Sequence, residues 1–435
     1  MKMRSRTRRY AVLLGIASIG AILIIWGGDI VKTGGTKFPG RSLTFARASP
    51  TGLVSAPVDG ATAPAVMEKP KVAHLATPVP LRAIYMTQCA VGTPSFRKDL
   101  VGLIDTTELN AVVIDIKDYT GRLAFTPADP SLKASVSDAC GAGDMEAFIK
   151  ELHEKNIYVI GRITVFQDPY YTALHPDLAV KRLSNKELNW KDHKGLSFID
   201  VSAKPYWDYI VKIAKASYEV GFDELNFDYI RFPSDGNMKD IYYSWNAEME
   251  KSEALERFYI YLHDQLSASN GKPTNGQWKP VMSVDLFGMV TTNYDDLNIG
   301  QVLERAMPYF DFIDPMVYPS HYPPGFNGYQ KVNEHSYDIV YFSLSHAVER
   351  TVATTTSISA LAFARIGTST PAVYEKPSYP ASKIRPWLQS FDYPVTYTPE
   401  MVSAQIKANT DAGLDSYLFW DPANKYRSLR EVLKE

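Results

Sequence analysis

The chain has 435 residues, of which 45% are hydrophobic and 22% are charged, which is enough apolar material for one large domain or two smaller ones. The formal net charge is -2, and basic residues crowd the first nine positions, so the remainder is mildly acidic. This balance argues against a general nucleic-acid-binding protein, and we expect no nucleic-acid partner.

An uncharged stretch, Tyr10 to Gly28 (YAVLLGIASIGAILIIWGG), follows the basic residues. As a helix it would span roughly 28 Å, which matches the hydrocarbon core of a bilayer. The cations before it, with none after it until Lys32, predict a cytoplasmic N-terminus. A cleaved signal peptide is the alternative, although no small-x-small site closely follows Trp26. We therefore expect residues 1–31 to be a basic tip and an uncleaved single-pass anchor in the cell membrane, with the folded part extracytoplasmic.

Residues 32–80 are rich in Pro, Ala, Thr, Gly and Ser and hold only two aromatic residues, Phe38 and Phe45. Such a composition cannot bury a core and is typical of a disordered tether. The folded domain is therefore predicted to occupy residues 81–435.

Short apolar or β-branched runs alternate with helical patterns from Leu81 onward. The predicted strands are Arg82–Thr87, Ala111–Ile116, Ile157–Val165, Glu224–Ile230, Val281–Phe287, Phe310–Tyr318, Arg385–Phe391 and Ser416–Trp420. Helical spacing predicts helices over Met145–Glu154, Ala247–Ser267 and Val302–Met307. Start signals predict two further helices, one capped by Ser202 and one that begins at Thr398. Eight strands, each followed by a helix or a long connection, predict an α/β fold of the (β/α)8 TIM-barrel class. A doubly wound open sheet is the alternative, but the first strand lacks a Gly-x-Gly-x-x-Gly after it.

In such a barrel the active site forms at the C-terminal ends of the strands, and acidic residues dominate there. Asp228 lies inside the apolar run ELNFDYI, where an unpaired carboxylate is costly to bury. Period-two alternation points Asn226 and Asp228 toward the barrel axis, and Asp285 behaves likewise on the fifth strand. Two carboxylates facing one pocket can cleave a glycosidic bond, one as nucleophile or base and the other as acid. We take Asp228 as the nucleophile or base and Asp285 as the acid, with Asp314 as the alternative acid.

Other polar and aromatic residues near the strand ends are candidates for substrate binding. Asp115 and Lys117 share a face in this pattern, so Lys117, or else Arg231, is expected to keep Asp228 ionised. A structural interpretation is the alternative for these residues, in which Asp228 is only the buried partner of Arg231 or Lys117. Asp168, Asp392 and Asp421 are better explained as turn formers or helix caps. The substrate-binding candidates are Tyr85, Lys117, Asp118, Arg162, Asn226, Arg231, Tyr318 and Trp420.

The cysteines and histidines carry little chemistry of their own. Cys89 and Cys140 are the only cysteines, and both a disulfide and two free thiols are compatible with the sequence. The chain has no Cys-x-x-Cys, no His-Glu-x-x-His and no Gly-x-Ser-x-Gly. We therefore expect no metal and no cofactor.

Two segments carry a family resemblance: TELNAVVIDIKDYTGRLAF (Thr107–Phe125) and GFDELNFDYIRFPSDG (Gly221–Gly236). Together they resemble the bacterial family named "putative glycosyl hydrolase domain", over about Leu81 to Tyr426. The family is similar to α-amylase-type barrel hydrolases, in which a fourth-strand Asp is the nucleophile and a fifth-strand acid is the proton donor. Asp228 matches the first position. Asp285 lies near the second, where amylases have Glu, and Asn226 replaces their Arg.

The sequence thus predicts a membrane-tethered barrel that hydrolyses an extracytoplasmic polysaccharide or oligosaccharide. A non-catalytic carbohydrate-binding or wall-scaffolding barrel is the competing interpretation. A deacetylase or lyase is a third, although a deacetylase would need an Asp-His-His metal set that is hard to assemble from this sequence.

Overall fold

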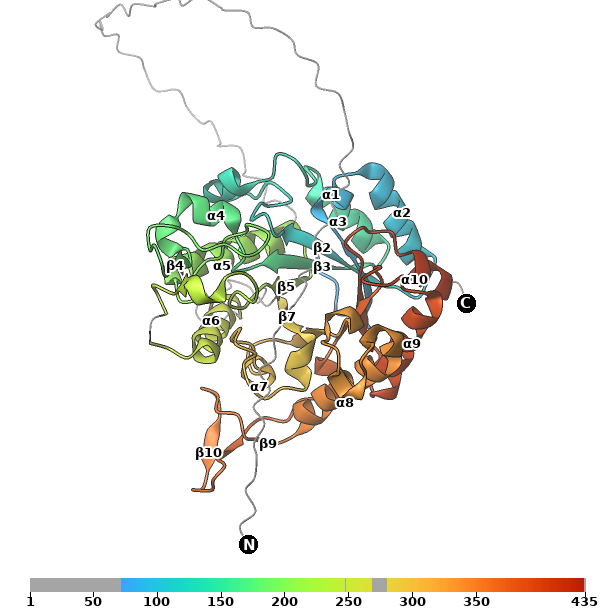
Figure 1. The fold of residues 1–435 in the computed structure, drawn as a ribbon. Coiled ribbons are helices and arrows are strands. Elements are labelled where there is room, and N and C mark those ends of the chain that lie inside the picture. The colour runs from blue at the N-terminus through green and yellow to red at the C-terminus, as the bar shows by residue number, and fades with distance from the viewer. Residues whose placement is uncertain (1–71, 247, 268–279, 434–435) are drawn as a thin grey trace, which may run out of the picture. The chain divides into compact units, whose positions relative to one another are not determined.

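A computed structural model describes residues 72–246, 248–267 and 280–433. Within them, parallel strands close into a barrel in the order β1-β13-β12-β8-β7-β5-β3-β2 (Figure 1). These strands are β1 Arg82–Met86, β2 Ala111–Lys117, β3 Tyr158–Thr164, β5 Glu224–Asp228, β7 Val281–Phe287, β8 Phe312–Met316, β12 Trp387–Gln389 and β13 Tyr417–Trp420. The closed sheet confirms the TIM barrel over an open sheet, and each predicted strand is present with slightly different ends.

Helices lie outside this barrel (Figure 1). They are α1 Gln88–Val91, α2 Pro94–Asp105, α3 Met145–Glu154, α4 Pro169–Leu174, α5 Lys204–Val220, α6 Lys251–Leu266, α7 Leu303–Ala306, α8 Ser336–Val352, α9 Pro399–Asp411 and α10 Arg427–Val432. Thr398 caps α9 as predicted, since its side chain accepts a hydrogen bond from Met401 N. The predicted cap at Ser202 is wrong: α5 begins after Ala203, and the Ser202 hydroxyl donates to Asn246 Oδ1 at 2.8 Å instead.

Strand alternation divides the apolar residues between two sides of the barrel wall. Ile84 and Ile114 belong to the large cluster that packs strands against helices. Val113 and Ile160 belong to a smaller cluster with Trp387, inside the barrel. The next inward residues along these two strands are Asp115 and Arg162, so the interior changes from apolar to charged toward the C-terminal ends.

The described chain begins before the predicted start of the domain. Leu75 N donates to Asp223 Oδ1 at 2.7 Å, and Thr77 Oγ1 lies 3.0 Å from Tyr158 Oη. Residues 72–80, assigned by composition to the linker, therefore contact the barrel. The rest of the predicted linker and the predicted membrane anchor lie outside the described residues. Among the helices that are described, none has the length and apolar character needed to cross a membrane.

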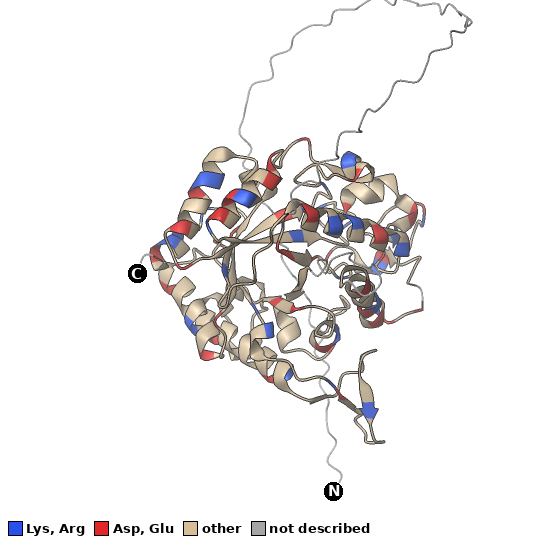
Figure 2. Cartoon of the chain, turned by 180° about the vertical axis from the view of Figure 1, so that it is seen from behind, with Lys and Arg blue, Asp and Glu red and all other residues tan. Residues whose placement is uncertain are grey.

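Two small sheets extend from the barrel connections. β4 Lys181–Arg182 pairs with β6 Ile241–Tyr242, and β9 Thr355–Thr356, β10 Ala364–Ile366 and β11 Val373–Glu375 form a separate arm at the lower left of Figure 1. Figure 2 shows that acidic and basic residues are interspersed along the outer helices.

Candidate active site

Asp228 and Asp285 lie at the C-terminal ends of neighbouring strands, β5 and β7, and share one arginine from β3. Arg162 Nε is 3.0 Å from Asp228 Oδ2 and 3.9 Å from Asp285 Oδ2. The two carboxylate oxygens are therefore at most about 7 Å apart, a limit that admits the separation of about 5–5.5 Å in retaining glycosidases and the lower end of the roughly 6.5–9.5 Å in inverting ones. The structure thus brings together the two carboxyl groups that strand alternation points inward.

Arg162 also binds a third carboxylate, Asp115 of β2. Its Nη1 donates to Asp115 Oδ1 at 2.6 Å, and the other oxygen of Asp115 accepts from the Tyr85 hydroxyl. Burial, the largest effect, raises the pKa of Asp115 to about 6, although Arg162 opposes this rise. Sequence reasoning did not select Asp115. Its signal was the same as that of Asp228, an acid within an apolar strand.

Asp285 is held from the other side by two N–H groups. Asp285 Oδ1 accepts from Trp387 Nε1 at 2.7 Å and from Asn226 Nδ2 at 2.9 Å. The carboxyl group is only 1% exposed. Burial and then the charges of Asp228 and Asp314 raise its pKa well above the usual range, in the direction that a proton donor needs.

Asp314 belongs to a second ionic cluster. Arg385 donates to Asp314 Oδ1 and Oδ2 at 3.2 and 3.1 Å, and its Nη1 donates to Glu224 Oε2 at 3.1 Å. Asn226 Nδ2 connects the two clusters, because it also lies 3.3 Å from Asp314 Oδ2. Burial raises the pKa of Asp314 to about 7 against the opposing effect of Arg385. Glu224 and Arg385 were not selected from the sequence, because the candidates were sought at the C-terminal ends of the strands. Glu224 is the first residue of β5, and Arg385 precedes β12.

The backbone immediately after Asp228 is strained. Tyr229 has a φ of 48°, in the left-handed region that an aromatic residue rarely adopts. This conformation directs Tyr229 N toward the preceding side chain, where it donates to Asp228 Oδ1 at 2.5 Å. Strain of this kind is concentrated at functional sites.

Aromatic side chains surround the mouth above these carboxylates. The rings of Tyr85 and Trp420 stack with centroids 3.8 Å apart, and the Arg162 guanidinium lies 4.9 Å from the Trp420 ring. Tyr318 packs edge-on against Phe391 at 5.6 Å. Asp228 is 5% exposed, so only a small part of its carboxylate reaches solvent.

Asp118 lies just after β2, at the edge of this mouth. It accepts hydrogen bonds from Gln88 Nε2 and from Thr120 N, the latter at 2.9 Å. Its side chain is therefore fixed by local contacts rather than paired with the central arginine.

The family model described as "Putative glycosyl hydrolase domain" matches residues 83–426. The chain belongs to this family. The match runs from β1 to the residue before α10 and so includes the whole carboxylate network. The comparison with curated proteins gives no match.

Solved structures with a similar fold include several glycoside hydrolases. The PgaB (BpsB) glycoside hydrolase domain from Bordetella bronchiseptica is 12% identical, with 81% of this chain and 98% of that chain covered and a TM-score of 0.53. The alpha-L-fucosidase isoenzyme 2 from Paenibacillus thiaminolyticus is 10% identical, with 82% and 49% covered and a TM-score of 0.50. A hypothetical protein from Ruminiclostridium thermocellum ATCC 27405 is 33% identical over 46% of this chain and 96% of that chain, with a TM-score of 0.40. The glycosyl hydrolase domain of this chain thus shares the barrel fold of the first two.

Lys117 of the glycosyl hydrolase domain does not share a face with Asp115, and this prediction is wrong. The pairing of β2 with β3 shifts between Asp115 and Lys117, which breaks the alternation. Lys117 Nζ instead lies 2.9 Å from Asp168 Oδ2 and 2.6 Å from Thr164 O, fully buried. The cation that contacts Asp228 is therefore Arg162, and not Lys117.

The strand-end acids of the domain that were predicted to be turn formers or caps have those structural roles. Asp168 Oδ1 caps α4 by accepting from Tyr171 N at 2.7 Å. Asp392 Oδ1 accepts from Tyr397 N at 2.8 Å, and Asp421 accepts from three backbone N–H groups of the turn that follows it.

Cys89 and Cys140 form a disulfide, which decides between the two alternatives left by the sequence. It joins α1, just after β1, to the long connection after β2. The two segments approach closely, because a Cβ on Gly92 would lie 2.3 Å from Gly141 O. Glycine is thus required beside the disulfide to let the backbones meet.

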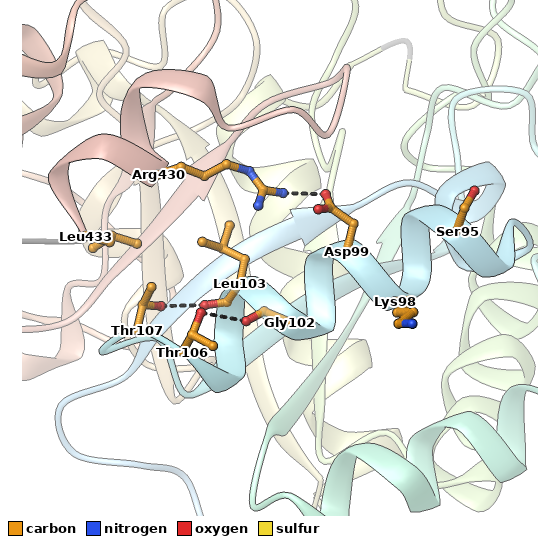
Figure 3. A pocket seen from close by; sticks show the side chains of 9 residues that line it. All are labelled: Ser95, Lys98, Asp99, Gly102, Leu103, Thr106, Thr107, Arg430 and Leu433. Carbon is orange, nitrogen blue, oxygen red and sulfur yellow. Dashed lines mark hydrogen bonds and ion pairs between the residues drawn. The ribbon is translucent and has the colours of Figure 1, made fainter.

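A separate groove of about 850 Å³ lies on the outside of the barrel, between α2 and α10 (Figure 3). Arg430 reaches across it to Asp99 Oδ2 at 2.5 Å. Its lining residues come from the outer helices, so it is distinct from the carboxylate network. In the described part of the chain, no cluster of three or more His, Cys, Asp or Glu side chains has the arrangement of a metal site.

Proposed function

We propose that the barrel hydrolyses glycosidic bonds of an extracytoplasmic polysaccharide, with Asp228 and Asp285 as the catalytic pair. The observation that carries this proposal is that two inward-facing carboxyl groups share Arg162 but have different environments. Membership of the family implies a carbohydrate substrate. The extension to a polysaccharide outside the membrane rests on the basic N-terminus and the apolar segment Tyr10–Gly28.

Asp228 would act in its ionised form. The Arg162 guanidinium and the Tyr229 N–H group together stabilise a negative charge on this side chain. It would attack the anomeric carbon in a retaining reaction, or activate a water molecule in an inverting one. The limit of about 7 Å between the oxygens is compatible with both outcomes.

Asp285 would be the proton donor. Its Oδ1 already accepts from two N–H groups, so the acidic proton belongs on Oδ2, the oxygen that faces Arg162 and Asp228. From there it would transfer the proton to the glycosidic oxygen as the bond breaks. Asp314 is bound by Arg385 in the second cluster, so we assign it a positioning role through Asn226.

The stacked Tyr85 and Trp420 rings would form the platform for a sugar ring, and Tyr318, which packs against Phe391, would be a further aromatic contact. Trp420 Nε1 is buried without a partner among the described residues, so a substrate hydroxyl would satisfy it. Asp118 at the rim would accept from a further hydroxyl.

The second candidate is a carbohydrate-binding barrel without chemistry, and the near-complete burial of Asp285 favours it. The full-length protein distinguishes the two on a panel of polysaccharides, when bound sugar and newly released reducing ends are both measured. Release of reducing ends supports hydrolysis. Binding without release, on every polysaccharide that binds, would replace the hydrolase with the binding protein.

A further inference from the structure

Arg231 is a buried cation near the catalytic pair whose charge is poorly compensated. Its side chain is 7% exposed, and its Nη1 donates to Phe232 O at 3.0 Å. The guanidinium otherwise faces aromatic rings, with the Tyr229 centroid at 5.0 Å and that of Phe287 at 5.1 Å.

The other buried arginines show what is unusual about this position. Arg162, Arg350 and Arg385 each have a carboxylate within 4.0 Å. Over residues 72–246, 248–267 and 280–433, no ion pair within this distance joins Arg231 to a carboxylate. Asp228, Asp235 and Asp192 attract it from further away, yet burial lowers its pKa. A buried charge with so little compensation is costly unless a ligand completes it.

Its place in the fold connects this cation to the candidate active site. Arg231 follows Asp228 by three residues, and Phe287 follows Asp285 by two at the end of β7. The guanidinium therefore lies beside the C-terminal ends of the two strands that carry the catalytic pair. Within the described chain, Arg231 Nη1 is the guanidinium nitrogen that donates a hydrogen bond, and Nε and Nη2 donate none and are not sealed from solvent. These N–H groups remain available for a planar, two-oxygen acceptor.

We propose that Arg231 binds an acidic substituent of the saccharide, so that the substrate class is an anionic polysaccharide. A uronic acid carboxylate is the group that best fits a planar fork, and a sulfate or phosphate ester offers the same oxygen chemistry. A neutral hydroxyl would occupy an N–H group but leave the charge uncompensated. This inference rests on the proposed function for the identity of the ligand as a saccharide.

The test measures affinity by calorimetry with the full-length protein carrying Asp228→Asn, so that a bound saccharide is not cleaved. The acidic probes are oligomers of galacturonate, of mannuronate and of hyaluronate, which contains glucuronate, together with one sulfated oligosaccharide. The neutral probes are the methyl ester of the galacturonate oligomer and a glucan oligomer. An acidic oligomer should bind at least about 10-fold more tightly than its neutral counterpart, because hydrogen bonds to charged groups are among the stronger ones. The sulfated probe distinguishes a sulfate ester from a carboxylate.

Substitution locates the effect. Arg231→Gln should weaken the acidic probe by about 10- to 100-fold and leave the neutral probe unchanged, while Arg231→Lys should retain part of the affinity. Arg430→Gln, in the groove between α2 and α10, is the matched control and should change neither. Any one of three results would overturn the inference. The acid and its methyl ester would bind with equal affinity, none of the acidic probes would bind, or Arg231→Gln would leave the affinity for the acidic probe unchanged. If Arg231→Gln does not fold, Arg231→Lys and the acid-ester comparison decide.

The inference and the proposed hydrolysis can fail separately. If acidic oligomers bind through Arg231 but the wild-type protein releases no reducing ends from them, hydrolysis fails and the inference stands. If the wild-type protein cleaves a neutral polysaccharide and Arg231→Gln leaves that rate unchanged, the inference fails and hydrolysis stands.

Discussion

Replacing Arg162 by glutamine would remove the cation that three carboxyl groups share. Arg162 donates to Asp228 at 3.0 Å and to Asp115 at 2.6 Å, and it lies 3.9 Å from Asp285. Removal of one partner from a buried ionic group typically costs about 3–5 kcal/mol, because the remaining charges stay buried without compensation. We expect the free energy of unfolding of Arg162→Gln to fall by that amount at pH 7.5.

The loss of unfolding free energy in Arg162→Gln should increase with pH. Burial already raises the pKa of Asp115 to about 6, and the pKa of Asp285 is raised as well. Without Arg162 these folded-state values rise further above the unfolded ones. A carboxyl group with a raised folded pKa contributes stability that is lost as pH rises through that pKa. The deficit of the variant should therefore be larger at pH 7.5 than at pH 5, where the carboxyl groups can take up protons.

Urea unfolding of the full-length protein at both pH values measures this deficit. Arg257→Gln is a matched control, since the half-exposed Arg257 binds Glu253 of the same helix at 3.1 and 2.7 Å and should contribute less than about 1 kcal/mol. An Arg162→Gln deficit below 1 kcal/mol, or one that is the same at pH 5 and pH 7.5, would refute the assignment of a shared cation.

Further predictions concern the disulfide, the acid and the membrane. Replacing both Cys89 and Cys140 by serine should reduce the free energy of unfolding by about 4 kcal/mol for a separation of 51 residues, as measured by urea unfolding; a loss under 1 kcal/mol would contradict the loop-entropy argument. If Asp285 is the acid, activity should fall as pH rises through its pKa, and Asp285→Asn should lose this limb of the kcat/KM profile on a substrate with a good leaving group. Cell fractionation should recover the intact chain with the membrane, whereas a soluble form that begins near Ser49 would contradict an uncleaved anchor.

The barrel was predictable because its strands are buried on both faces. Parallel strands of this kind read as short apolar runs, such as AVVI and IYVI, so each strand was found from sequence. The ends were less accurate. The strand predicted to reach Ile230 stops at Asp228, because Tyr229 adopts a left-handed backbone conformation that no residue pattern indicated.

Those features of the site that depend on a single strand could be predicted, and those that depend on how strands pair could not. Alternation correctly pointed Asp228 and Asp285 inward. Which cation meets Asp228 depends on the register between β2 and β3, and the shift after Asp115 turned Lys117 away and left Arg162 in place. The contact between Arg385 and Glu224 spans 161 residues, and no local pattern reports such a pairing.

The rate of the Asp228→Asn variant tests the central claim most directly. On any polysaccharide that the wild-type protein cleaves, this variant should retain the wild-type circular dichroism spectrum and lose turnover by about 10⁴-fold or more, because the carboxylate acts chiefly in the transition state. Asp392→Asn, which changes a strand-end acid bound to Tyr397 N, should stay within a few-fold of the wild-type rate. A folded Asp228→Asn variant with full activity would contradict the assignment of Asp228 as nucleophile or base.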